Sequence, residues 1–347
     1  METPVISLPT LQWAYQTFQK AFFLLDPEFA HKVAMESLEK LKPLLSVPVF
    51  PKETQVHVFD HRLAHPIGLA AGFDKEGNHA HLMSKLGFSY IEAGTFTPKK
   101  QVGNPKPRLF REVRQKSLRN KMGFNNPGIS LGIDNLNQEA NKIDKEKLPT
   151  KIAISIGKQK ETKEEDAIRD YINCIQTIQE KANQNLKERI LYIAINVSSP
   201  NTKGLRNLQE DKTLTELIQT LKSISTFPLV VKLAPDFPSD ADFQNTVKTC
   251  KNADGIIVTN TTTQYQSKFG EGGVSGELLK DLAEKRLKQA KEVLPENFPI
   301  IASGGIMTPE DIDTRLQEGA ILVQVFTGWI YSGPALILNW IKNYSQP

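Results

Sequence analysis

Two lysines in apolar surroundings are the first candidates for chemistry in this sequence. Lys232 interrupts the apolar run Leu229–Ala234, and Lys75 comes shortly after the run Ile67–Ala71. Because a buried ammonium group without a partner is costly, Lys232 must meet an anion, a developing negative charge or a carbonyl substrate. Lys75 fits either the same role or that of a solvated loop residue. A lysine so placed can bind an anion or form a Schiff base.

A second cluster carries amide and hydroxyl groups at the end of an apolar run, in the segment Asn196-Val197-Ser198-Ser199-Pro200-Asn201-Thr202. Asparagine side chains offer donors and an acceptor, so they suit the amide edges of a flat heterocycle. Asn120, Asn125 and Asn260 have the same capacity. A serine in this segment can be a nucleophile, a base or a turn former. Without a Gly-x-Ser-x-Gly elbow or a histidine in the motif, the sequence does not support a hydrolase triad.

Three glycine-containing loops form the third candidate. They are Gly272–Gly276, Ser303–Gly305 and the segment around Thr327. Backbone N–H groups in such loops make the phosphate cradle that is usual in α/β barrels. Glycines that only make tight turns are the alternative. Three such loops close together in the fold favour a phosphorylated ligand.

Short apolar runs that alternate with amphipathic stretches must position these groups. The expected strands are Ile67–Ala71, Tyr90–Gly94, Ile152–Ile156, Ile190–Val197, Leu229–Leu233, Gly255–Thr259, Pro299–Ala302 and Ile321–Phe326. The expected helices between them include Glu164–Lys181, Leu214–Ile224, Asp240–Cys250, Gly276–Val293 and Pro309–Gln317. Eight such units predict an α/β fold, a (β/α)8 TIM barrel, although an open doubly wound sheet has the same local pattern. Polar residues follow nearly every strand, which favours the barrel, because those ends share one mouth.

Two further segments lie outside the eight units. Arg108–Val113 and Ser117–Met122 predict a small hairpin over the mouth. Before the barrel, apolar residues at helical spacing predict a helical hairpin whose second helix begins at Asp26-Pro27. We therefore divide the chain into an N-terminal helical extension, residues 1–50, and a barrel, residues 51–347. The aromatic face with Tyr15, Phe18, Phe22 and Phe23 suits a membrane interface, or else packs against the barrel.

Composition excludes several classes of protein. The 347 residues carry a formal net charge of only +4, without basic runs, so nucleic acid is not expected as a partner. The sequence has no apolar stretch of about 18 residues, the length that a membrane-spanning helix needs. Its first residues lack the basic region of a secretory signal. Six scattered histidines and two cysteines show no metal-ligand spacing, so no metal is expected.

Seven segments of the chain together resemble the dihydroorotate dehydrogenase family. The matching motifs, in chain order, are Gly68–Lys75, Glu92–Thr95, Gly103–Arg108, Asn120–Asn126, Asn196–Thr202, Lys232–Asp236 and Thr259–Thr262. Ser199 stands where the soluble class has cysteine, and the N-terminal helical pair is similar to that of the quinone-dependent, membrane-associated class 2. The resemblance implies oxidation of (S)-dihydroorotate to orotate in pyrimidine (UMP) biosynthesis, with FMN as hydride acceptor and a membrane quinone as final acceptor.

Site residues follow from the resemblance position by position, with Ser199 as the catalytic base. Dihydroorotate is expected at Lys75, Asn120, Lys121, Met122, Gly123, Phe124, Asn196, Asn201, Asn260 and Thr261. FMN is expected at Ala71, Gly72, Phe73, Asp74, Lys75, Thr95, Ser155, Asn196, Lys232, Thr259, Gly276, Gly305, Phe326 and Thr327. Ser155 replaces a common asparagine and Phe326 a common tyrosine.

The quinone is expected at His31 and Arg111, at the inner end of a tunnel formed by the N-terminal helices. These helices are expected to place the protein on the cytoplasmic face of a membrane, the inner membrane in a bacterium, as a peripheral protein. The segment Lys203–Arg206 is expected to form a mobile lid. Two other functions remain open at this point: an aldolase-type barrel with a Schiff base on Lys232, and a catalytically silent binding protein at a membrane surface.

Overall fold

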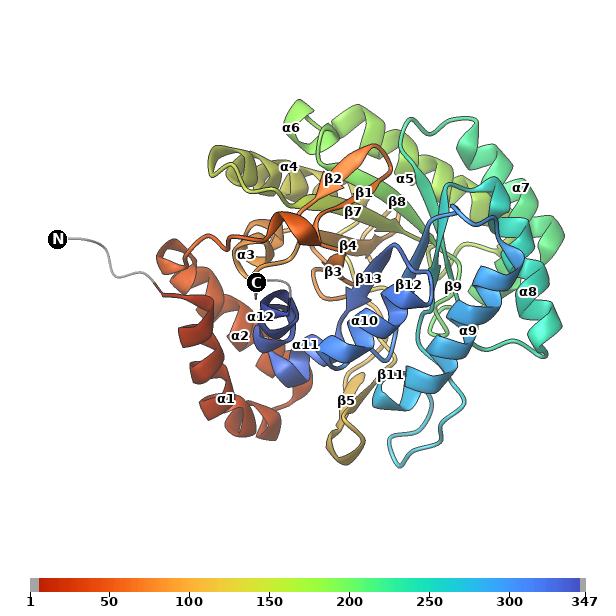
Figure 1. Ribbon diagram of the computed structural model, residues 1–347. Helices are drawn as coiled ribbons and strands as arrows, with labels where there is room; N and C mark the ends of the chain where they lie inside the picture. The colour runs from red at the N-terminus through yellow and green to blue at the C-terminus, as the bar shows by residue number, and fades with distance from the viewer. Residues whose placement is uncertain (1–5, 344–347) are drawn as a thin grey trace.

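Eight parallel strands close into a barrel in the computed structural model, which describes residues 6–343 (Figure 1). In barrel order the strands are β3 (Ile67–Leu69), β4 (Tyr90–Phe96), β7 (Lys151–Ile156), β8 (Ile190–Asn196), β9 (Leu229–Leu233), β10 (Gly255–Val258), β12 (Ile300–Ser303) and β13 (Leu322–Val325). Strand β13 pairs with β3, from Val323 opposite Ile67 to Val325 opposite Leu69. This pairing closes the sheet, so the predicted barrel is confirmed and the open sheet is excluded.

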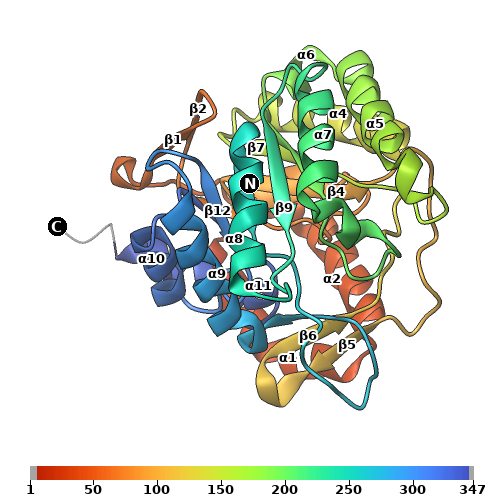
Figure 2. The same cartoon turned by 90° about the vertical axis from the view of Figure 1, so that its right-hand side faces the viewer.

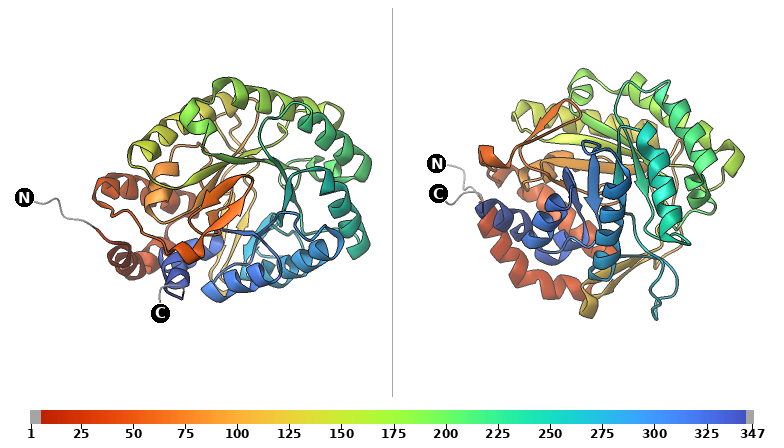
Figure 3. Two further views of the ribbon diagram at one scale, coloured as in Figure 1. Left: turned by 45° about the horizontal axis from the view of Figure 1, so that its top comes forward. Right: turned by 45° about the vertical axis from the view of Figure 1, so that its right-hand side comes forward.

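Helices surround the barrel (Figures 2 and 3). They are α3 (Ala80–Lys85), α4 (Ile129–Lys145), α5 (Ala167–Lys181), α6 (Gln184–Lys187), α7 (Asp211–Lys222), α8 (Asp240–Thr249), α9 (Lys280–Val293), α10 (Pro309–Gln317), α11 (Thr327–Ser332) and α12 (Ala335–Lys342). In α5 the residues Tyr171, Cys174, Ile175 and Ile178 are buried, at the spacing that keeps them on one side of a helix. Helix α10 begins as predicted, because Thr308 and Asp311 form a capping box around Pro309.

A hairpin covers the end of the barrel opposite the mouth. Its strands are β1 (Val56–Val58) and β2 (His61–Leu63), and it crosses the barrel end in the left view of Figure 3. Val58 and Leu63 belong to the buried apolar cluster that contains Tyr90 and Tyr192 of the barrel interior. The hairpin therefore closes this end of the barrel interior with apolar side chains.

A three-stranded antiparallel sheet lies over the mouth. It contains β5 (Leu109–Glu112), β6 (Ser117–Asn120) and β11 (Gly273–Gly276), with Asn120 opposite Gly273. The first two strands confirm the predicted hairpin. The third strand corrects the sequence interpretation, because Gly276 ends a strand, and α9 begins only at Lys280 after a short 3-10 turn. Pairing with β6 decides this local structure, and β6 is more than 150 residues away in the chain.

The N-terminal hairpin consists of α1 (Leu8–Leu24) and α2 (Pro27–Leu41), with Asp26 as the N-cap of α2. Helix α1 lies beside α11 and α12 (Figure 1). Tyr15 donates a hydrogen bond to the backbone carbonyl of Ile330, and Gln19 donates to that of Tyr331 at 2.6 Å. The hairpin is therefore held to the C-terminal helices by directional contacts.

The aromatic face expected at a membrane interface is divided. Tyr15 and Phe23 pack against α11, Tyr15 through its hydrogen bond to Ile330 and Phe23 through an edge-on contact with Tyr331. Phe18, in contrast, is 57% exposed. Further exposed apolar side chains of the hairpin are Trp13 at 68% and Leu24 at 89%. Among residues 6–343, no helix has the length and apolar character needed to cross a membrane. The division of the chain at residue 50 stays a prediction.

Candidate active site

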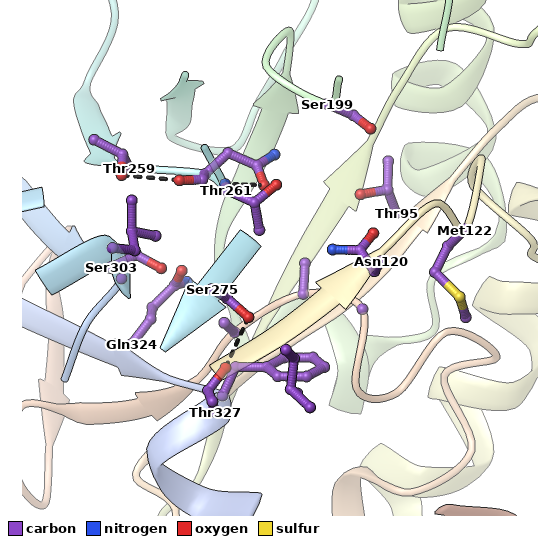
Figure 4. Close-up of a pocket in the computed structure, with 18 of the residues that line it drawn as sticks. Thr95, Asn120, Met122, Ser199, Thr259, Thr261, Ser275, Ser303, Gln324 and Thr327 are labelled. Atoms are coloured by element: carbon purple, nitrogen blue, oxygen red, sulfur yellow. Dashed lines mark hydrogen bonds between the residues drawn. The ribbon is translucent and has the colours of Figure 1, made fainter. Parts of the chain in front are cut away.

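One cavity opens at the carboxyl ends of the barrel strands, under the three-stranded mouth sheet, and encloses about 1170 Å³ including its open mouth (Figure 4). Most predicted site residues line it, although they come from strands and loops spread along the whole barrel. They are Ala71, Gly72, Lys75, Thr95, Asn120, Met122, Gly123, Phe124, Asn196, Ser199, Asn201, Lys232, Thr259, Asn260, Thr261, Gly276, Gly305, Phe326 and Thr327. The fold thus joins the three candidate clusters of the sequence in a single cavity.

Four of the residues predicted to bind the substrate or FMN do not line this cavity. The Asp74 carboxylate accepts hydrogen bonds from the backbone N–H groups of residues 77, 78 and 79, so it shapes a turn. The Ser155 hydroxyl is buried and shares a 2.8 Å hydrogen bond with Thr95. Lys121 donates to the Phe269 carbonyl at 3.2 Å. Phe73 is buried beside Phe326, at 5.6 Å between ring centroids.

The two predicted quinone residues lie where the N-terminal hairpin meets the barrel. The His31 ring contacts Phe73 edge-on at 4.8 Å. Burial lowers the pKa of His31 to about 3, and the nearby Lys75 and His79 charges add to this effect. Arg111 donates to the Leu25 carbonyl at 2.7 Å and lies 5.0 Å from the centre of the Phe23 ring. His31 is therefore a neutral ring at physiological pH.

An aromatic series connects His31 with the cavity. His31 contacts Phe73, Phe73 contacts Phe326, and Phe326 lines the cavity wall. Two phenyl rings, Phe73 and Phe326, thus lie between His31 of the hairpin and the cavity. Arg111 lies on β5 and contacts Leu25, in the turn between α1 and α2.

A buried polar network forms the floor of the cavity. Lys232 is 4% exposed, and its ammonium lies 3.2 Å from a carboxylate oxygen of Glu92, which is 0% exposed. The other Glu92 oxygen accepts from the Tyr192 hydroxyl at 3.0 Å and from the Gln324 amide. Burial and the Glu92 charge raise the pKa of Tyr192 well above its ordinary value. The anion required by the Lys232 charge is therefore Glu92.

Glu92 and Gln324 are functional candidates that the sequence reasoning missed. Both interrupt apolar strands in the same way as Lys232, in Ile91-Glu92-Ala93 and Val323-Gln324-Val325. Gln324 also accepts from Lys232 at 3.3 Å and lines the cavity. A charged or amide residue inside each of three buried strands was the signal that could have found them.

The predicted phosphate cradle lies on the side of the cavity formed by β11, β12 and β13. Ser275 and Thr327 share a 2.8 Å hydroxyl hydrogen bond there, visible in Figure 4. Gly305 has a φ of +70°, and a Cβ atom at this position would lie 2.2 Å from the Cα atom of Lys280. Gly276 has a φ of +90°. Only glycine fits these positions without strain. Both glycines line the cavity, so a phosphate group can approach their backbone closely.

Lys75 is the cation that faces the substrate side. Burial lowers its pKa to about 8, while the Glu28 carboxylate acts in the opposite direction. A desolvated ammonium gains most when an anion enters its site. The cavity therefore favours a ligand that brings negative charge to Lys75.

Two sets of hydrogen-bonded amide and hydroxyl groups lie around Ser199. Asn260 donates to the Ser198 hydroxyl at 2.9 Å, and this hydroxyl donates to Asn196 at 3.0 Å. The Ser199 hydroxyl accepts from the backbone N–H of Asn201 at 3.3 Å. Asn201 in turn donates to Asn120 at 3.0 Å. Ser198 is thus fixed by other side chains, whereas Ser199 lines the cavity and its oxygen accepts the long contact from the Asn201 backbone.

Comparison with known proteins agrees with this geometry. A model of the dihydroorotate dehydrogenase family matches residues 53–344. The chain therefore belongs to the dihydroorotate dehydrogenase family, a family of barrel oxidoreductases.

Its curated relatives identify the class. A dihydroorotate dehydrogenase (quinone) of Sulfurimonas denitrificans is 38% identical over 94% of this chain and 92% of its own length. One of Acinetobacter baumannii is 37% identical over 94% and 98%. The crystal structure of DHODH from Eimeria tenella in complex with ferulenol superposes with a TM-score of 0.82 and 32% identity, over 92% of this chain and 90% of that one. The expected quinone-dependent class 2 is confirmed.

Proposed function

We propose that this chain oxidises (S)-dihydroorotate to orotate in pyrimidine biosynthesis, with FMN as hydride acceptor, Ser199 as base and a membrane quinone as final electron acceptor. The observation that carries the proposal is one cavity that joins the Ser199 hydroxyl, a set of asparagine amides and a glycine cradle. Similarity to quinone-dependent relatives along nearly the whole chain supports the same activity.

The substrate side of the cavity suits a flat anionic imide. Asn120, Asn201 and Asn260 offer amide donors and acceptors to ring N–H and C=O groups. Lys75 supplies a cation for the carboxylate. These contacts orient the ring so that one C–H bond faces Ser199, and holding the reacting atoms in this way supplies much of the rate.

Ser199 removes the ring proton in this proposal. An unassisted serine is a weak base, so it needs a dry site, a relay that takes up its own hydroxyl proton as it accepts the proton from the ring, and stabilisation of negative charge nearby. The hydroxyl is buried and hydrogen-bonded to the backbone N–H of Asn201, and Lys75 lines the same cavity. Burial excludes water, and the ammonium stabilises charge that develops on the substrate.

The cavity residues fit FMN. Gly305 and Gly276 would hold its phosphate together with Ser275 and Thr327, since both glycines line the cavity and a side chain at either would collide with neighbouring backbone and displace the loop. Lys232 would contact its ring system from the cavity floor. When bound, FMN accepts a hydride from carbon and passes electrons on to a quinone.

The Schiff-base alternative is disfavoured by the environment of Lys232. An amine must be neutral to attack a carbonyl group. Here the amine is an ammonium paired with the buried Glu92 carboxylate, and Tyr192 and Gln324 fix that carboxylate in turn. The Lys232 nitrogen is therefore engaged by this carboxylate, at 3.2 Å, and is held away from a carbonyl substrate.

Quinone is proposed to reach the site through the N-terminal hairpin, between His31 and Arg111. The aromatic contacts from His31 to Phe326 supply an apolar boundary that suits a lipid-soluble acceptor. The exposed side chains of Trp13, Phe18 and Leu24 suit contact with a membrane surface.

Anaerobic flavin reduction tests the proposal. The purified protein should be yellow and should bleach when dihydroorotate is added without air. Ser199→Ala should keep FMN and lower the bleaching rate by several orders of magnitude. Ser198→Ala is the matched control, and it should cost less than about tenfold because this hydroxyl only fixes Asn196 and Asn260.

The outcomes separate the alternatives. Near-normal bleaching by Ser199→Ala would remove Ser199 from its role. A colourless protein that borohydride traps with a carbonyl compound would favour the aldolase-type reaction, and a yellow protein that does not bleach would favour the binding protein. His31→Ala should bleach normally but transfer electrons slowly to a short-chain quinone, and unchanged transfer would refute the quinone assignment.

A further inference from the structure

Arg206, which lies outside the cavity lining, donates hydrogen bonds to two loops that contain proposed substrate-binding residues, the loops after β8 and β10. Arg206 lies in the 3-10 helix Leu205–Gln209, which follows the Ser199 segment. Its Nε donates to the Ser198 carbonyl at 3.0 Å, and its Nη2 donates to the Thr261 carbonyl at 3.0 Å. Its Nη1 donates to the Asp236 carboxylate at 2.9 Å. The guanidinium thus joins the loops after β8, β9 and β10.

Asp236 completes this junction from the other side. Besides Arg206, its carboxylate accepts from the Thr262 hydroxyl at 2.5 Å, and from the backbone N–H of Thr263 at 2.8 Å and its hydroxyl at 3.1 Å. The Arg206 and Asp236 side chains are 24% and 14% exposed, so their pairing is partly shielded from water. The loop after β10 is therefore held by both members of the pair.

The short helix that carries Arg206 is anchored as well. Leu205 and Leu208 are buried, and the Gln209 side chain accepts from the backbone N–H of Ala234 at 2.9 Å. A Cβ atom at Gly204 would lie 2.0 Å from the Glu164 carboxylate, so the chain at Gly204 passes close to the segment between β7 and α5. The segment expected to form a lid is thus seen in a clamped arrangement.

The carbonyls that Arg206 holds belong to peptide units next to functional groups. The Ser198 carbonyl forms the peptide bond with Ser199, and Thr261 is the neighbour of Asn260. The Ser199 hydroxyl has only the long backbone contact to Asn201, so its position depends on the backbone that carries it. Arginine suits this task because its planar fork donates in three fixed directions, whereas lysine is a single point charge.

We propose that Arg206, paired with Asp236, is a positioning residue that fixes Ser199 and the Asn260–Thr261 loop in the geometry for proton removal. The inference rests on the proposed function, since it assumes Ser199 as the base. Arg206 touches neither substrate nor flavin in this assignment. It acts through the two backbone carbonyls, and a displacement of about 1 Å at the reacting atoms can lower the rate about 100-fold.

Separate half-reactions test the inference in the holoenzyme. Arg206→Ala should lower the rate of flavin bleaching by dihydroorotate by about 100-fold and leave reoxidation by a short-chain quinone within twofold. Arg206→Lys should fall between this variant and the wild type, and Asp236→Asn should act in the same direction. These last two variants conserve side-chain volume, so they serve if Arg206→Ala fails to fold.

A matched control exists at the opposite end of the barrel. Arg189 donates to the Leu148 and Thr150 carbonyls at 3.0 and 3.2 Å and pairs with Asp144 at 3.2 Å, the same kind of contacts away from the cavity. Arg189→Ala should leave both half-reactions within twofold. An equal loss of bleaching in this control would show that any such arginine merely supports the fold, and would overturn the inference.

A double substitution distinguishes positioning of the base from a general effect. Because part of the Arg206 effect acts through Ser199, replacing Arg206 in the Ser199→Ala background should lower bleaching by much less than the loss of about 100-fold in the wild-type background, and the remaining loss reports the Asn260–Thr261 loop. Additive losses, equal losses in both half-reactions, or near-normal bleaching by Arg206→Lys and Asp236→Asn would each overturn the inference. Failure of the wild type to bleach would instead refute the proposed function.

Discussion

The buried pair of Lys232 and Glu92 allows a quantitative prediction about stability. Lys232 is 4% exposed and Glu92 is fully buried, with 3.2 Å between their charged atoms. Breaking such a pair from one side leaves an uncompensated charge in the interior, which costs about 3–5 kcal/mol. The test variants are Lys232→Met, Glu92→Gln and the double variant.

The two single variants should differ, because the partners left behind differ. Without Lys232, the Glu92 carboxylate keeps the Tyr192 hydroxyl and the Gln324 amide as donors. Without the Glu92 charge, Lys232 keeps neutral acceptors such as the Gln324 oxygen, at 3.3 Å, and no anion to balance its charge. We expect Lys232→Met to cost about 3 kcal/mol and Glu92→Gln about 5 kcal/mol. The double variant should cost about 2–3 kcal/mol less than their sum, because it leaves no unpaired charge.

Urea denaturation at one fixed FMN concentration, followed by circular dichroism and tryptophan fluorescence, measures these free energies. Loss of the contact with FMN lowers the free energy of unfolding of Lys232→Met and of the double variant by the same amount. This contribution therefore cancels in the coupling energy. The exposed pair Lys32–Glu36, with side chains 71% and 61% exposed, is the control, and its coupling should stay below about 0.5 kcal/mol. Additivity within about 0.5 kcal/mol at the buried pair would refute the reasoning.

Three further predictions follow from the cavity and the N-terminal hairpin. Lys75 is charged below its pKa of about 8, so orotate affinity should fall about tenfold between pH 7 and pH 9, as measured by flavin absorbance. Lys75→Arg should remove this pH dependence of orotate affinity. An orotate affinity of the wild type that does not change with pH would contradict the assignment. Gly305→Ala should lower FMN affinity at least about tenfold because its Cβ atom meets the backbone of α9, whereas Gly319→Ala, which meets only a flexible lysine side chain, should retain FMN in equilibrium dialysis. Phe18→Ser with Leu24→Ser should lower sedimentation with anionic lipid vesicles at least about tenfold, and unchanged binding would place the membrane contact elsewhere.

Local pattern was sufficient for much of the fold. Apolar runs separated by amphipathic stretches located all eight barrel strands, because a strand buried on both faces is apolar along nearly all of its length. Capping residues marked two helix starts, at Asp26 and at Thr308, since a cap is an interaction within one turn of chain. The resemblance motifs also named most of the residues that line the cavity.

The local sequence pattern could not predict contacts between residues that are far apart in the chain. The chain could show that Lys232 needs an anion, but Glu92 lies 140 residues away and becomes its partner only when the barrel closes. Ser155 lies at the expected strand end, yet its hydroxyl bonds Thr95 and stays outside the cavity lining.

The sequence by itself determined the order of the elements and the residue types at the ends of the strands, because periodicity and capping depend on neighbours in the chain. Only the tertiary structure decided that Gly273–Gly276 is a strand, that Tyr15 packs inward while Phe18 stays exposed, and that Arg206 joins three loops. Each of these outcomes depends on which surfaces meet after the barrel closes. Hydrogen-bond geometry and burial then choose between options that the local sequence leaves equal.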